Sequence, residues 1–367
     1  MRILQVYPGV FAPNRGGGVS TYVKNISERL AKEHEVTVFA TNTGDLPEHE
    51  WVGNIEVRRF PRLSPGVSYF FSPEMLLEIT RAEYDVIHGH NYHALPMHFS
   101  VFPKKGKRIL STHYHGVGHS SFRNALMKRL NILGRYVVGR ADEIVAVSEY
   151  EKRLLVHNLS IPPERIHVIP DGVDKAAFKN YPKKLSQKIQ LLYVGRIEYY
   201  KGIHHIIEVL PKIKNVDFLI VGKGSHKSNL QKRSTELKLG DRVLFVQDLS
   251  YPELIKKFSE SDVMILLSRY ESYSIVVAEA LSAGTPCIVA NTSALTEWVD
   301  NKTCYGIDLP INHLKLEDLI NKVTSFNREY YSAFGSSIDS SNYLTNVKKP
   351  IYDWDEVVAQ LTELYAK

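Results

Sequence analysis

The sequence predicts an α/β protein with two doubly wound domains, and three observations support this prediction. The chain has 367 residues, more than a single hydrophobic core usually organises. Short apolar runs alternate with amphipathic helical stretches, which is typical of a parallel sheet covered by helices. A polar, lysine-rich segment interrupts this alternation, which restarts at residue 190. We therefore expect an N-terminal domain (1–178), a linker (179–189) and a C-terminal domain (190–351).

The predicted strands are short, mostly apolar and rich in β-branched residues, as buried parallel strands are. In the N-terminal half they comprise residues 2–7, 36–40, 55–60, 85–88, 108–111 and 143–147. In the C-terminal half they comprise residues 190–194, 217–221, 242–246, 262–267 and 286–290. Residues 327–350 are rich in Ser, Tyr and Asn and lack a clear apolar period, so no element is predicted there. A last helix runs to Tyr365, with Asp353 as its N-cap.

The composition excludes several other classes of protein. Apolar residues make up 44% and charged residues 23% of the chain, which are ordinary globular values. No apolar run approaches about 18 residues, so no membrane span is expected, and the N-terminus lacks the apolar region of a signal peptide. Cys287 and Cys304 have neither a zinc nor a redox spacing and are expected to be a reduced pair. We therefore expect a cytoplasmic protein.

Two acids in the C-terminal half form the most informative motif. Glu271 and Glu279 lie eight positions apart, with an apolar run between them that predicts a helix over 275–283. Backbone N–H groups near Ser274 and Ile275 would then lie between the two acids, where the helix dipole favours phosphate. Two carboxylates that accept hydroxyl hydrogen bonds around an anion site suit a nucleotide-sugar. The alternative is a pair of ordinary helix carboxylates.

A second motif predicts a phosphate clamp. Gly195 follows the predicted strand 190–194, and Arg196 and Lys201 lie five positions apart before a helix start. The glycine lets the backbone approach a ligand closely, and the two cations can neutralise phosphate in place of a metal.

A third motif lies near the N-terminus. The glycines Gly16, Gly17 and Gly18 follow the first predicted strand and precede a helix predicted over 19–32. Three glycines do not stabilise a loop, so we expect them to allow close backbone approach to a ligand. Neither glycine-containing motif matches the dinucleotide fingerprint or the P-loop.

Together and in this order, these motifs resemble the large family of retaining glycosyltransferases called group 1 or family 4, which have the GT-B fold. The resemblance covers nearly the whole chain and includes residues 111–116, 147–149, 169–174, 221–224, 261–263 and 283–286. It implies two Rossmann-like domains that face a cleft. It also implies that a Trp-containing final helix (352–367) crosses back to the N-terminal domain.

The resemblance further implies roles for individual residues. Glu279 would bind the ribose hydroxyls, and Glu271 would bind hydroxyls of the transferred sugar. Arg196, Lys201 and the helix N-terminus would stabilise the charge that develops on the leaving diphosphate, without a metal or other cofactor. His113 would lie near the sugar and the phosphate, where it could donate a hydrogen bond or orient the acceptor.

The expected reaction moves a hexose or N-acetylhexosamine from a UDP- or GDP-sugar to a hydroxyl acceptor. The sequence offers no clear carboxylate nucleophile for double displacement. We therefore expect front-face transfer, in which the leaving phosphate helps to take the acceptor proton. The expected catalytic residues are His113, Arg196, Lys201 and Glu271, and the expected donor-binding residues are Gly16, Gly17, Gly18, Gly195, Arg196, Lys201, Gly222, Gln247, Glu271, Ser274, Ile275 and Glu279.

Two alternatives stand beside this expectation. The first is an epimerase or phosphorylase of the same fold, but the lysine motif of a pyridoxal-phosphate phosphorylase is not found, and the intact Glu271–Glu279 motif favours transfer. The second is a non-catalytic, nucleotide-sugar-binding partner subunit of a glycosyltransferase. The presence of Arg196, Lys201 and His113 together argues against it, because an inactive partner does not need the whole set.

Two patterns in the sequence are similar to metal sites without supporting one. His88 and His90 lie on one face of a predicted strand, but no third ligand has a recognisable spacing. Asp353 and Asp355 spell the metal-binding motif of a different glycosyltransferase fold, and helix capping explains them better. No metal site is predicted.

The basic residues are unevenly distributed. Residues 101–140 contain nine basic residues and no acid, whereas the whole chain carries +6 and the remainder therefore −3. Apolar residues at helical spacing alternate there with cations such as Lys128 and Arg129, and a basic amphipathic helix of this kind can lie on an anionic membrane. The alternative is a core-facing helix with a solvated basic face. The first interpretation predicts an anionic acceptor such as a lipid phosphate, and peripheral association with the inner face of the cell membrane. No nucleic-acid-binding module is recognised.

Overall fold

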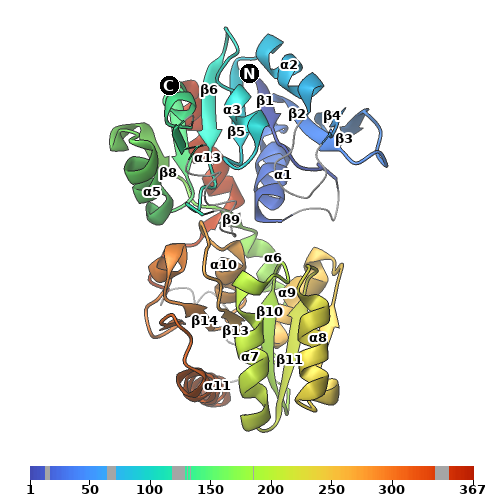
Figure 1. The fold of residues 1–367 in the computed structure, drawn as a ribbon, viewed down its shortest axis with the longest axis vertical. Helices are drawn as coiled ribbons and strands as arrows, with labels where there is room; N and C mark the ends of the chain where they lie inside the picture. The colour runs from blue at the N-terminus through green and yellow to red at the C-terminus, as the bar shows by residue number, and fades with distance from the viewer. Residues whose placement is uncertain are drawn as a thin grey trace. The chain divides into compact units, whose positions relative to one another are not determined.

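The computed structural model describes residues 1–12, 17–63, 72–117, 129, 131–132, 134–184, 186–334 and 347–367. The chain divides into two compact units (Figure 1). The first contains Met1–Gly172 and Tyr352–Lys367, and the second contains Val173–Ile351. The second unit thus begins before the predicted linker, and residues 179–189 belong to it.

The first unit contains an eight-stranded sheet with the order β3-β4-β2-β1-β5-β6-β7-β8. Its strands are β1 (Arg2–Val6), β2 (Glu35–Asn42), β3 (His49–Val52), β4 (Ile55–Pro61), β5 (Val86–His90), β6 (Lys107–Ser111), β7 (Glu143–Ala146) and β8 (Ile166–Val168). All neighbouring strands are parallel except β3 and β4, which are antiparallel. The central strands β1 and β5 are almost completely buried, as their apolar sequences predict.

The helices of the first unit are α1 (Gly18–Leu30), α2 (Pro73–Arg81), α3 (Leu95–Phe99), α5 (Glu149–Leu159), the 3₁₀ turn η1 (Pro163–Arg165) and α13 (Trp354–Ala366). Residues 131–132 and 134–138 are also helical. The predicted N-cap of the last helix is confirmed, since the Asp353 side chain accepts a hydrogen bond from the Asp355 backbone N–H. Helix α13 lies against α1, where Arg29 Nε donates to Asp355 Oδ1 at 2.8 Å. The predicted return of this helix to the N-terminal unit is therefore confirmed.

The second unit contains a six-stranded, fully parallel sheet with the order β12-β11-β10-β13-β14-β15. Its strands are β10 (Ile189–Val194), β11 (Val216–Val221), β12 (Val243–Val246), β13 (Val263–Leu266), β14 (Cys287–Ala290) and β15 (Cys304–Ile307). Two short strands, β9 (Gly172–Val173) and β16 (Tyr352–Asp353), lie where the chain passes between the units. Strands β3, β8 and β15 were not predicted.

The helices of the second unit are α6 (Lys175–Lys179), α7 (Ile203–Val209), α8 (Lys227–Glu236), α9 (Tyr251–Glu260), α10 (Ile275–Ser282) and α11 (His313–Phe334). Its 3₁₀ turns are η2 (Tyr199–Lys201), η3 (Leu210–Lys212), η4 (Gly240–Arg242) and η5 (Ser293–Glu297). Helix α11 extends into the segment 327–350, where the sequence predicted no element. Among the helices that the structure describes, none has the length and hydropathy needed to cross a bilayer.

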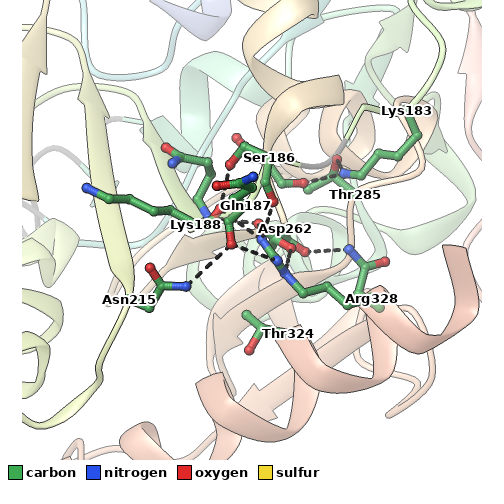
Figure 2. Close-up of polar contacts among 12 residues, drawn as sticks. Lys183, Ser186, Gln187, Lys188, Asn215, Asp262, Thr285, Thr324 and Arg328 are labelled. Carbon is green, nitrogen blue, oxygen red and sulfur yellow. Dashed lines mark hydrogen bonds and ion pairs between the residues drawn. The ribbon is translucent and has the colours of Figure 1, made fainter. Parts of the chain in front are cut away.

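The predicted linker is fixed to the second unit by a group of polar contacts (Figure 2). Asp262, at the start of β13, is fully buried and receives two hydrogen bonds from the Arg328 guanidinium, at 2.7 and 3.0 Å. The same guanidinium donates to the backbone carbonyls of Ser186 and Lys188, at 3.0 and 2.8 Å. Lys183 is buried as well, and its ammonium donates to Thr285 Oγ1 at 2.6 Å. Charged side chains that satisfy backbone carbonyls in this way make the segment part of the folded unit.

Replacement of Arg328 tests this anchoring. We expect Arg328→Ala to lower the free energy of unfolding of the second unit by about 3 kcal/mol, because the fully buried Asp262 carboxylate loses the guanidinium that pairs with it. Urea unfolding followed by circular dichroism measures the effect. Lys322→Ala, an exposed position on the same helix, is the matched control and should change stability little. Equal stability of the two variants would contradict this account of the segment.

Candidate active site

Three of the predicted donor-binding residues directly follow three adjacent strands. Gly195 follows β10, Gly222 follows β11 and Gln247 follows β12, and these strands are neighbours in a parallel sheet. Their carboxyl ends therefore meet at one edge, where ligands of open α/β sheets bind. Gly222 has a φ of +144°, and a Cβ atom there would lie 1.9 Å from the Gly195 carbonyl oxygen. Only glycine allows the two loops to approach so closely.

The clamp cation and one of the two motif acids contact each other directly. Lys201 Nζ lies 2.5 Å from Glu271 Oε1, and the two side chains are 11% and 15% exposed. Lys201 ends the turn η2, and Gly202 follows it with a φ of +74°. A Cβ atom at Gly202 would lie 2.4 Å from the Leu267 carbonyl oxygen, so a glycine is required to bring the turn against the end of β13. The structure thus brings together two predicted residues that lie 70 positions apart.

Arg196, the second clamp cation, lies in the loop between Gly195 and η2. One guanidinium nitrogen donates to the Tyr200 hydroxyl at 2.7 Å. Its backbone carbonyl accepts a hydrogen bond from the buried Tyr193 hydroxyl at 2.6 Å, which fixes the loop to β10. The Arg196 side chain therefore stays at the exposed end of the clamp.

The N-terminus of α10 lies between the two motif acids, as predicted. Ser274 is its N-cap, has left-handed backbone angles (φ +79°, ψ +75°) and makes no side-chain capping bond. Its Oγ is buried and has no hydrogen-bond partner among the described residues. The first turn, which begins with Ile275, contains no acidic residue to offset the helix dipole. This helix end is therefore available to an anion.

Glu279 lies inside α10 and is only 5% exposed. Burial raises the pKa of its carboxyl group to about 8, against which a hydrogen bond from the Tyr251 hydroxyl acts. Tyr251 opens α9, directly after the Ser250 capping box. Tyr251 was not among the predicted site residues. The capping box indicates where α9 begins, but no sequence signal links that helix end to Glu279.

The remaining predicted residues belong to the first unit. Gly17 is the N-cap of α1, and Gly18 is its first residue. A Cβ atom at either would have no neighbour within 4 Å in the described structure, so both glycines border open space. Gly16 lies outside the described residues.

His113 lies just beyond the end of β6 with a left-handed backbone (φ +46°). Its ring packs edge-to-face against the Tyr22 ring of α1, with centroids 5.0 Å apart. Burial lowers the pKa of the imidazole to about 4, so the ring is neutral at physiological pH. Its Nε2 is buried and meets no hydrogen-bond partner in the part of the chain that the structure describes.

His88 and His90 take part in a buried network. His88 bonds the Tyr365 hydroxyl and Ser111 Oγ, both at 2.7 Å, and His90 Nε2 bonds Gln5 Oε1 at 2.7 Å. These bonds attach β5 to α13 and to the neighbouring strands. Across the described ranges, no three His, Cys, Asp or Glu side chains are arranged to hold a metal ion.

The basic stretch is described in part. Lys128 lies outside the described residues, and Arg129 is exposed. Val137 is buried in the core of the first unit, so one face of this helix packs inward. The opposite face carries Ile132 and Tyr136, which are 77% and 63% exposed. The inward face is expected of a core-facing helix, and the exposed apolar side chains are expected of a membrane-binding helix, so one feature of each interpretation is present.

Comparison with known proteins identifies the family. Residues 16–177 match the family described as Glycosyltransferase Family 4, and residues 174–337 match Glycosyl transferases group 1. An uncharacterised glycosyltransferase of Methanocaldococcus jannaschii is 25% identical over 97% of this chain and 95% of its own. One of the proteins of the human phosphatidylinositol N-acetylglucosaminyltransferase is 22% identical over 97% of this chain and 74% of its own. The structure of Anabaena HepE in complex with UDP-glucose aligns with a TM-score of 0.76 at 16% identity, over 100% of this chain and 99% of that one.

The chain therefore belongs to the group 1 glycosyltransferases, with the GT-B fold. It is an enzyme of the class that transfers a sugar from a nucleotide-sugar.

The raised pKa of Glu279 predicts a pH dependence of stability. The unfolded carboxyl group loses its proton near pH 4.5 and the folded one near pH 8, so stability falls as pH rises between these values. Glu279→Gln keeps an acceptor for Tyr251 but removes the titration. We expect this variant to gain thermal stability relative to the parent as pH rises from 4.5 to 8. Melting curves across this range measure it, with Glu329→Gln on the exposed face of α11 as control. A constant difference between variant and parent across the range would contradict the burial of an ionisable Glu279.

Proposed function

We propose that the chain is a retaining, metal-independent glycosyltransferase that moves a hexose or N-acetylhexosamine from a UDP- or GDP-sugar to a hydroxyl acceptor. One observation carries the proposal: the Lys201–Glu271 ion pair lies beside the open N-terminus of α10, and Glu279 is buried in the same helix. This arrangement offers an anion site with a carboxyl group at each end, Glu271 and Glu279, that can accept hydrogen bonds from hydroxyl groups. A nucleotide-sugar has the matching order of groups, because its diphosphate lies between a sugar and a ribose that both carry hydroxyl groups.

The anion site suits a departing diphosphate. Cleavage of the bond between the anomeric carbon and phosphate leaves negative charge on the phosphate oxygens. The Lys201 ammonium, the Arg196 guanidinium and the N–H groups at the start of α10 can stabilise that charge as it develops. Glu271 holds the ammonium at this position in the absence of donor. The incoming phosphate can then share the ammonium, and Glu271 is left to accept hydrogen bonds from the sugar.

Front-face transfer accounts for retention with these residues. The bond from the anomeric carbon to the acceptor oxygen forms on the face from which the diphosphate departs, and the acceptor proton passes to a phosphate oxygen. No second carboxylate is needed on the far face. The neutral His113 ring can donate a hydrogen bond to the sugar or orient the acceptor. The UDP-glucose complex of Anabaena HepE supports a nucleotide-sugar donor for this fold.

Removal of the clamp ammonium tests the proposal. We expect Lys201→Ala to reduce turnover by about 10²- to 10³-fold, as loss of a preorganised charge at the leaving group does. Release of nucleotide diphosphate and transfer of the sugar, both assayed in EDTA, are the measurements. Lys232→Ala removes an exposed ammonium from α8 and should leave turnover unchanged. Near-parental turnover of Lys201→Ala, or full loss of parental activity in EDTA, would contradict the proposed chemistry.

We further propose that the acceptor is lipid-linked and that the enzyme binds an anionic membrane through the helix around residues 131–138. On its exposed face, Ile132 and Tyr136 lie one helical turn apart, with Arg129 and Arg135 exposed nearby. Arg140 also stacks over the Tyr136 ring, with its guanidinium carbon 5.3 Å from the centroid. Apolar side chains surrounded by cations fit the boundary between acyl chains and anionic headgroups. The human relative named above acts, by its name, on phosphatidylinositol.

Charge reversal on this helix tests membrane binding. The double substitution Arg129→Glu and Arg135→Glu should weaken binding to vesicles that contain phosphatidylglycerol by at least about tenfold, because each cation near the surface contributes about 1 kcal/mol. Co-sedimentation with the vesicles measures binding. Lys214→Glu with Lys232→Glu makes the same change in net charge on the second unit and should have little effect. Equal binding of both double variants, or no binding of the parent, would overturn the membrane proposal.

A further inference from the structure

A carboxylate that the proposed chemistry does not use is completely buried below His113. Glu151 lies in the first turn of α5 and is 0% exposed. It accepts hydrogen bonds from Thr112 Oγ1, from the Tyr114 backbone N–H at 2.5 Å and from the Val147 backbone N–H at 2.8 Å. Two of these donors are the immediate neighbours of His113. The carboxylate therefore holds the loop on both sides of the histidine.

The backbone at His113 needs such support. Its φ of +46° lies in the left-handed region, which residues other than glycine rarely adopt and which persists where the surroundings impose it. The bond from Thr112 comes from the residue before it and the bond from Tyr114 from the residue after it. The Tyr114 bond holds the peptide group that follows His113, and the Thr112 hydroxyl bond holds the residue that precedes it, so both sides of the left-handed turn are tied to Glu151.

The site also requires a carboxylate in particular. Oε1 accepts from Thr112 and Tyr114, and Oε2 accepts from Val147 at the end of β7. An amide has a single acceptor oxygen and would direct its NH₂ group at one of these N–H donors. Only a side chain with two acceptor oxygens can hold the His113 loop and the end of the neighbouring strand at the same time. Burial itself opposes the charge and raises the pKa of Glu151 to about 7, so the three donors compensate a cost that an apolar side chain would not have.

We propose that Glu151 is a positioning residue, which keeps His113 in its left-handed, buried pose at the active site. The proposal rests on the proposed function for the task of His113, but the pose itself can be measured without turnover.

The test follows the imidazole of His113 by NMR. In the parent, burial holds the pKa of His113 at about 4. If Glu151→Gln releases the loop, the ring gains contact with water and its pKa rises toward 6.5, the ordinary value. With its pKa raised to about 7, the Glu151 carboxyl group is largely protonated at the pH where His113 titrates, and loss of any negative charge that it keeps there would by itself lower the pKa of the histidine. A rise therefore reports exposure of the ring and not the missing charge.

The controls separate positioning from general stability. Glu149→Gln removes an exposed carboxylate from the same turn of α5 and should leave the pKa of His113 unchanged. Thr112→Val removes one of the two flanking bonds with little change in volume, and it decides the question if Glu151→Gln does not fold. The titratable groups around the ring, Tyr22, His88 and His90, stay in place in every variant. The signal of His113 is assigned from its absence in His113→Gln.

Turnover gives a second readout. With the acceptor in excess, we expect Glu151→Gln to lower kcat by about tenfold, which corresponds to loss of one oriented hydrogen bond in the transition state. The KM for the donor should stay near the parental value, because the donor site is left intact. A pKa of His113 near 4 in folded Glu151→Gln and Thr112→Val would overturn the positioning role. A raised pKa with unchanged kcat would overturn the link to catalysis. Loss of turnover in Lys201→Ala tests the proposed function separately.

Discussion

The ion pair between Lys201 and Glu271 is the interaction on which the proposed site depends. It joins the turn after β10 to the loop before α10 across 2.5 Å. Because both side chains are largely buried, the attraction is less screened than in a surface pair, and the geometry is correspondingly better defined. Gly202 makes the pair attainable, since its left-handed turn brings Lys201 against the end of β13. An ammonium held in this way needs no reorganisation when negative charge arrives, which is the condition for efficient electrostatic catalysis.

In each unit, a buried residue with left-handed backbone angles lies where a strand leads into a loop or a loop leads into a helix. In the second unit it is Ser274, and in the first it is His113. Each is largely excluded from water, and each has a side-chain atom, Ser274 Oγ or His113 Nε2, that no described residue satisfies. Strained backbone and unsatisfied polar atoms cost stability, and proteins retain them chiefly where a ligand makes use of them. Hydrogen bonds in the surrounding structure, such as those that Glu151 accepts from the His113 loop, offset this loss of stability.

The sequence predicted the fold well where period and composition carry the information. The alternation of apolar runs and helical stretches predicted the parallel sheets, and the capping residue Asp353 marked the start of α13. Contacts between segments that are distant in the sequence could not be predicted. Hydrogen bonding between Tyr251 and Glu279 depends on how α9 packs beside α10, and the support of His113 by Glu151 depends on how α5 packs below β6. The predicted linker lies within the second unit, and a polar composition does not reveal that Arg328 binds its backbone or that its own Lys183 binds Thr285.

Donor selection by the purified protein in EDTA tests the central claim most directly. UDP- and GDP-linked glucose, mannose, galactose and N-acetylglucosamine would be compared for thermal stabilisation and for slow release of nucleotide diphosphate. The account predicts that one of these donors stabilises the protein and is slowly hydrolysed without a metal, because Arg196, Lys201 and the α10 N-terminus supply the positive charge. Failure of every donor to bind, even after divalent metal is restored, would contradict the assignment of the Glu271–Glu279 motif to a nucleotide-sugar.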